Sequence, residues 1–143
     1  MTTFPVSGDI QFAPASGTLF VDDLIDPSGK PTTVLDIDAG FTIKGRVVLP
    51  GWLSGRGLVR ITADEKGGPI DKTIGQQLIT IPGATTPNDP PAITYRFQIL
   101  VKSPTLPDES KMYDLGVVFV FQTPAGGHTD IGGFYDLGAF LVV

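Results

Sequence analysis

Residues 93–102 decide the fold, and they read Ile93-Thr94-Tyr95-Arg96-Phe97-Gln98-Ile99-Leu100-Val101-Lys102. Apolar and polar side chains alternate along this stretch, and only Leu100 breaks the alternation. A period of two is typical of a β-strand that has one buried face and one face in water. The same pattern returns at 41–49 and at 113–121. The chain is therefore expected to be a β-sheet protein whose apolar faces share a core.

Other segments predict shorter strands, with Pro- and Gly-containing turns between them. These strands are expected at 10–12, 19–24, 32–38, 58–64, 77–81, 131–135 and 138–143, and the strand around 113–121 is expected to extend over 111–122. No window predicts an amphipathic helix of useful length, because glycine and proline interrupt every candidate. The connections are too short to hold crossover helices, so the pairing is expected to be mostly antiparallel.

The predicted fold class is all-β, with roughly 8–10 strands and essentially no helix. A single domain is expected over residues 1–143, folded as an antiparallel β-sandwich, because stacking two sheets buries one apolar face of every strand. The architecture resembles immunoglobulin-like or jelly-roll-like sandwiches. It lacks the cysteine pair of immunoglobulin domains, since the chain has no cysteine.

The charge balance disfavours several classes of partner. The chain has ten Lys and Arg against fifteen Asp and Glu, which gives a formal net charge of −5. The basic residues are scattered singly in the sequence, so nucleic-acid binding and docking on an anionic membrane are not expected. The absence of cysteine excludes disulfides, thiol nucleophiles and thiolate metal sites.

The N-terminal residues have neither a positive region nor an apolar run, so they do not predict a signal peptide. No apolar stretch reaches the length of a membrane span. We expect a cytoplasmic protein, or a component of a particle that assembles in the cytosol.

Few residues in the sequence could carry catalysis. His128 is the single histidine, and it lies in a glycine-containing stretch that predicts a surface turn. A serine–histidine–aspartate site would need a rigidly held imidazole, which such a turn does not provide. The chain is therefore expected not to be an enzyme, and no catalytic, cofactor-binding or metal-binding residue is assigned.

Five aspartates around the first predicted turn leave one metal hypothesis open, and they are Asp22, Asp23, Asp26, Asp36 and Asp38. Calcium binds six to eight oxygen ligands in flexible loops, and these carboxylates could supply some of them. No EF-hand spacing supports a calcium site. A solvated surface is the favoured interpretation, with calcium as the alternative.

Trp52 is the single tryptophan, and it lies in a predicted loop. It is expected either to close one end of the core or, as the alternative, to provide a stacking platform for a carbohydrate or an anchor for a protein.

The apolar C-terminal segment is the strongest indication of function. Residues 134–143 are apolar on both faces, so their strand cannot be an ordinary exposed edge. Either the protein's own core buries both faces, or the outer face packs on another subunit. The residues predicted for such an interaction surface are Trp52, Val118, Val120, Phe140 and Val142.

These features favour a non-catalytic structural or protein-interaction module that self-associates or docks on a larger assembly. The alternative is a module that binds calcium or carbohydrate through the loop carboxylates or Trp52.

Overall fold

The computed structural model describes residues 6–11, 17–32, 34–36, 39–67, 71–83, 92–102 and 111–142. These residues form strands and turns, with no helix among them. In chain order the strands are β1 (Val6–Gln11), β2 (Gly17–Ile25), β3 (Val34–Leu35), β4 (Phe41–Pro50), β5 (Gly55–Glu65), β6 (Asp71–Ile81), β7 (Ala92–Val101), β8 (Lys111–Gln122) and β9 (His128–Val142). The all-β prediction is confirmed.

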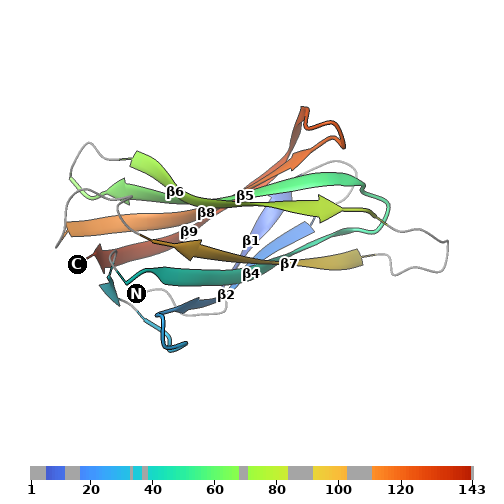
Figure 1. Ribbon diagram of the computed structural model, residues 1–143. Helices are drawn as coiled ribbons and strands as arrows, with labels where there is room; N and C mark the ends of the chain where they lie inside the picture. The colour runs from blue at the N-terminus through green and yellow to red at the C-terminus, as the bar shows by residue number, and fades with distance from the viewer. Residues whose placement is uncertain are drawn as a thin grey trace.

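Backbone hydrogen bonds join these strands into one continuous path, in the order β6-β5-β8-β9-β1-β2-β4-β7. Neighbours along the path pair antiparallel, and β3 pairs parallel with β9 beside it. The path curls into a half-barrel, so that β6, β5 and β8 lie above β2, β4 and β7 in Figure 1. An immunoglobulin-like or jelly-roll-like sandwich is not confirmed, because the ladder runs unbroken from one layer to the other through β1 and β2.

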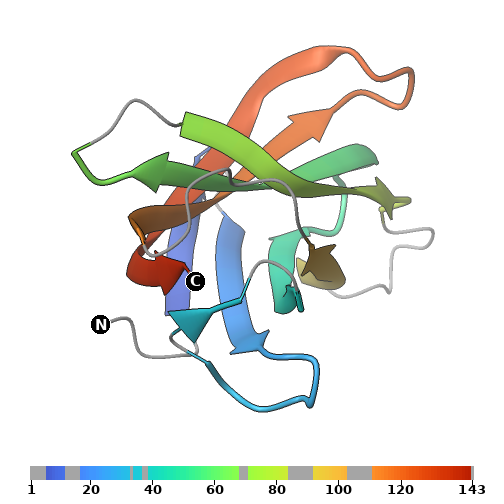
Figure 2. The ribbon, with the colours of Figure 1, turned by 60° about the vertical axis from the view of Figure 1, so that its left-hand side comes forward.

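The ends of the path, β6 and β7, lie close together without forming a ladder with each other. The backbone N–H of Gln98 in β7 donates to the side-chain Oε1 of Gln77 in β6 over 2.9 Å. Figure 2 shows the resulting cross-section, in which the two layers enclose the interior. The side chain of Gln77 thus accepts the hydrogen bond of a backbone N–H that a carbonyl of a neighbouring strand would otherwise accept at the edge of β7.

The predicted alternation of β7 is confirmed residue by residue. Phe97, Ile99 and Val101 are buried, whereas the residues between them are exposed. In β4 the buried positions alternate in the same way from Phe41 to Leu49. In β8, Tyr113 lies on the face that the alternation predicts to be buried, and it is fully buried. The apolar faces of the two layers meet in one core.

The C-terminal segment is one strand rather than the two pieces that the sequence predicts. β9 pairs with β8 along its length and contacts β1 and β3 on its other side. The register between β8 and β9 shifts between Leu115 and Gly116, so Leu137 is an extra residue without a cross-strand partner in β8. The next residue, Gly138, has a φ of 92°. This local bulge lets the strand continue past residues that appear, in the sequence, to end it. The expectation that β9 is not an edge strand is confirmed.

Glycines inside strands make room for aromatic rings. A Cβ atom at Gly45 would lie 2.3 Å from Cζ of Phe97, its cross-strand neighbour, and 2.3 Å from the carbonyl oxygen of Phe20. At Gly55 the same atom would lie 2.7 Å from the ring of Phe121. The sequence predicts a loop over 52–57, but β5 begins at Gly55. The prediction holds for residues 52–54 and is wrong for residues 55–57, because a strand glycine beneath a ring resembles a turn glycine in the sequence.

Gly45→Ala is expected to destabilise the protein by about 1–3 kcal/mol, the usual cost of overpacking a core. The added methyl group would meet both a ring and a main-chain oxygen, and the main chain cannot move without distorting the ladder between β2 and β4. Urea unfolding measures the loss. Thr42→Ala, on the outer face of the same strand, is the control and should change stability by no more than about 0.5 kcal/mol. Equal effects of the two substitutions would contradict the crowding at Gly45.

Candidate functional site

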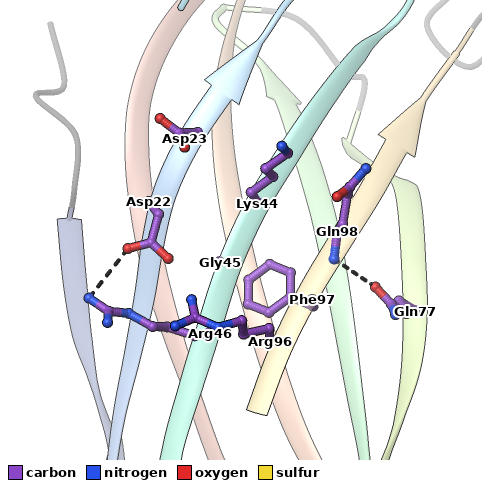
Figure 3. A pocket seen from close by; sticks show the side chains of 9 residues that line it. All are labelled: Asp22, Asp23, Lys44, Gly45, Arg46, Gln77, Arg96, Phe97 and Gln98. Carbon is purple, nitrogen blue, oxygen red and sulfur yellow. Dashed lines mark hydrogen bonds and ion pairs between the residues drawn. The ribbon is translucent and has the colours of Figure 1, made fainter. Parts of the chain in front are cut away.

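An open hollow of about 460 Å³ lies on the outer side of β2, β4 and β7 and reaches the edge of β6. Its lining consists of Asp22, Asp23, Lys44, Gly45, Arg46, Gln77, Arg96, Phe97 and Gln98 (Figure 3). Its volume is within the range of small-molecule sites in proteins. Charged and amide side chains dominate the lining.

The strand register brings these residues together. Phe20, Arg46 and Arg96 form one row across β2, β4 and β7, and Asp23, Lys44 and Gln98 form the next row on the same face. Since successive residues of a strand point to opposite faces, Gly45 and Phe97, between the two rows, direct no side chain outward. The hollow lies over this position.

Asp22 enters the site through a β-bulge. The register of β2 against β4 shifts between Val21 and Asp23, which leaves Asp22 without a cross-strand partner. A bulge of this kind turns a side chain away from its regular direction. Asp22 thereby lies beside Arg46 on the face that carries Asp23.

Arg46 is held in place by two contacts. Its Nη2 lies 3.4 Å from Oδ1 of Asp22, and its Cζ lies 4.4 Å from the centroid of the Phe20 ring. Both charged side chains are about a third exposed, so the ion pair contributes at most about 1 kcal/mol. The ring contact adds a cation–π attraction. Together they give the guanidinium a defined position at one side of the hollow.

Arg96 and Lys44 have no ion pair or hydrogen bond from their side chains to any residue that the structure describes. Figure 3 shows Arg96 extending from β7 toward Arg46. Three cations thus share the hollow with two carboxylates, Asp22 and Asp23, which leaves one positive charge in excess on a chain whose net charge is −5. The lining can bind an anionic group and can also accept hydrogen bonds.

Of the described aspartates of the calcium hypothesis, Asp22 and Asp23 share the hollow, and no third one joins them there. Asp22 is paired with Arg46, and Asp36 accepts a hydrogen bond from the N–H of Ala39 within its own turn. Asp38 lies outside the described residues. Among the side chains that the structure describes, no group of three Asp, Glu or His residues is arranged to hold a metal ion.

Asp26 organises the turn between β2 and β3. Its Oδ1 accepts the hydroxyl of Ser28 at 2.6 Å and the backbone N–H groups of Ser28 and Lys30 at 2.9 and 3.0 Å. The pKa of the Asp26 carboxyl lies below its ordinary value, first because of the Ser28 hydroxyl and then because of the Lys30 N–H. Stabilising the turn accounts for this carboxylate without a metal.

The residues predicted for an interaction surface differ in their exposure. Phe140 and Val142 are buried in the core, so they offer no contact to a partner. Val118 and Val120 are half-buried on the outer face of β8. Trp52 is 60% exposed, and its neighbour Leu53 is buried instead. The expectation that Trp52 closes one end of the core is therefore wrong, and its indole is accessible.

The outer face around Val118 and Val120 forms an apolar patch over four strands. Leu78, Leu58 and Val120 are in register across β6, β5 and β8, while Val118 is in register with Phe134 of β9. Leu78 is 49% exposed and Phe134 is 58% exposed. We call Leu58, Leu78, Val118, Val120 and Phe134 the outer apolar patch.

His128 is the first residue of β9 and is paired with Gln122, whereas the sequence predicts a turn there. The turn precedes it, at 123–127, where the N–H of Gly126 donates to the carbonyl of Thr123. The side chain of His128 lies outside the described residues. The expectation that the chain is not an enzyme stays a prediction.

Sequence reasoning missed the cationic residues of the hollow. Lys44, Arg46 and Arg96 are separated by up to fifty-two positions, and each one alone is an ordinary polar residue on a wet strand face. The pairing of β4 with β7 makes Arg46 and Arg96 direct neighbours. Only the shared period of two in residues 41–49 and 93–102 could have indicated that these cations point outward.

No family model, curated protein or solved structure matches this chain. Within the described ranges there is no helix with the length and hydropathy that a membrane span requires.

Proposed function

We propose that this protein is a non-catalytic structural or protein-interaction module that self-associates through its outer apolar patch. The observation that carries the proposal is the continuity of the patch over β6, β5, β8 and β9. Single apolar residues on a surface are normal, whereas a contiguous group on one face is typical of an interface.

The outer apolar patch has a surface that can pack against a second β-sheet. Gly116 and Gly132 lie beside it on β8 and β9 and add no side chains. A Cβ atom at Gly116 would lie 2.6 Å from the ring of Phe134, so this ring lies against the strand. A face of this kind can pack against another sheet at the usual spacing of about 10 Å.

We infer that the partner is a second copy of this chain. The patch has a cation and a carboxylate at its border, Arg60 on β5 and Asp136 on β9, in adjacent register rows. A two-fold dimer brings the same surface of both copies together and can therefore match the two signs of charge. Action in the cytosol or in a cytosol-assembled particle remains part of this proposal.

The test compares two leucine substitutions. Leu78→Glu places a charge in the outer apolar patch, and Leu100→Glu places the same charge on another exposed leucine, on β7 outside the patch. Sedimentation velocity should give the wild type and Leu100→Glu twice the chain mass of 15.1 kDa, and Leu78→Glu the mass of one chain. A monomeric wild type at all concentrations, or a dimer that Leu78→Glu leaves intact, would refute the proposal.

Trp52 supports a second candidate function, the binding of a carbohydrate by stacking. The single observation in its favour is the 60% exposure of the side chain. Quenching or a shift of the tryptophan fluorescence in neutral oligosaccharide titrations is the expected result, and Trp52→Ala should abolish binding. An unchanged spectrum with every sugar would remove this candidate.

A further inference from the structure

We infer that the hollow between β2, β4 and β7 binds a small molecule that carries one oxyanion, a carboxylate or a phosphate, together with neutral hydroxyl groups. The hollow and the outer apolar patch have no residue in common, so the ligand can bind whether or not the patch forms a dimer.

Two arginines of the hollow place positive charges side by side. Arg46 and Arg96 are direct cross-strand neighbours, and like charges in such a pair repel each other. Asp22 compensates Arg46, while Arg96 is left without a partner among the described residues. A bound anion beside Arg96 would remove this repulsion and would gain charge-assisted hydrogen bonds.

Arg46 is preorganised to meet an anion. The contacts to Asp22 and Phe20 already fix the guanidinium of Arg46 before a ligand arrives. Lys44 lies two residues along the same strand face, about 7 Å away at the rise of a β-strand. An anion beside Arg46 would therefore meet one guanidinium that loses little further side-chain entropy on binding, with the charge of Lys44 within reach on the same face.

The carboxylates and amides of the hollow indicate which neutral groups the ligand carries. The carboxylates of Asp22 and Asp23 would repel a ligand that carries a negative charge at both ends, but they can accept hydrogen bonds from hydroxyl groups. The amide of Gln98, in the same row as Asp23, can both donate and accept. A volume of about 460 Å³ has room for a body attached to the charged group. Sugar acids and sugar phosphates have this combination of one charged group and several hydroxyls.

Calorimetric titration of the wild-type chain with four compounds tests the inference. Glucuronate carries the carboxylate, glucose 6-phosphate carries the phosphate, glucose lacks the charge, and inorganic phosphate lacks the hydroxyl groups. At least one of the two charged sugars should bind, and the stronger of the two identifies the oxyanion. Glucose should not bind, and inorganic phosphate should bind at least tenfold more weakly than the better charged sugar. Equal binding of glucose, or no binding of either charged sugar, would overturn the inference, and equal binding of inorganic phosphate would overturn the role of the hydroxyl groups.

Two arginine substitutions locate the site. Arg96→Gln should weaken binding of the better charged sugar about tenfold or more, as expected for losing a hydrogen bond to a charged group. Arg60→Gln, on the outer face of β5, is the matched control and should leave binding unchanged. Thermal unfolding without ligand should show that Arg96→Gln is folded, with a melting temperature no lower than that of the wild type. Binding that survives Arg96→Gln, or falls equally with Arg60→Gln, would place the ligand elsewhere and overturn the inference.

Discussion

Phe140→Ala is expected to lower the free energy of unfolding by about 3–5 kcal/mol, because the substitution leaves a cavity in a close-packed core. Phe140 is only 2% exposed, and it pairs across the ladder with Tyr113, which is fully buried. The total stability of a domain is about 5–15 kcal/mol, so this loss is a large part of it. Urea unfolding followed by circular dichroism measures the change.

Phe134→Ala is the matched control, since it removes the same side chain from the same strand. Phe134 is 58% exposed, and its loss should cost the isolated chain less than about 1 kcal/mol. It should instead weaken self-association, as Phe134 belongs to the outer apolar patch. If the two substitutions destabilised the chain equally, the assignment of the inner and outer faces of β9 would be wrong.

Phe97→Ala should cause a comparable loss, about 3–5 kcal/mol. The ring is 4% exposed and packs against Gly45, which has no side chain of its own to fill the space that the ring would leave. It also lines the hollow next to Arg96 in β7, so its removal is expected to change the shape of the hollow. Chemical unfolding measures the stability, and the titrations described above report on the hollow.

Leu100→Ala serves as the control for this second substitution. Leu100 is on the same strand and is 64% exposed, the one apolar residue that interrupts the alternation of residues 93–102. Its truncation should change stability by no more than about 0.5 kcal/mol. A loss below about 1 kcal/mol for Phe97→Ala, or a large loss for Leu100→Ala, would reverse the faces assigned to β7.

The two proposed surfaces share a single strand, β6. Leu78 belongs to the outer apolar patch, and its neighbour Gln77 lines the hollow and accepts the hydrogen bond from β7. Successive residues of a strand point to opposite faces, so one strand can serve both surfaces without placing them in contact. Dimerisation and ligand binding are therefore expected to be compatible in the same molecule.

The sequence by itself determined which side chains of β4, β7 and β8 are buried. The alternation in residues 41–49, 93–102 and 113–121 predicts the inner faces of β4, β7 and β8, because a strand with one buried face has no other period available. The exclusion of helices followed in the same way, from glycine and proline in every candidate window. Burial along one strand is a local property, and local patterns are sufficient to predict it.

Only the tertiary structure decided how the strands pair and what their outer faces bring together. The glycines of β5 resemble a turn until the rings of β8 are placed beside them, and β9 appears broken until a bulge carries it past Gly138. Arg46 and Arg96 become a pair only because β4 lies next to β7. Register depends on contacts between residues far apart in the chain. The solvent-exposed face of a strand has no hydrophobic pattern from which those contacts could be predicted.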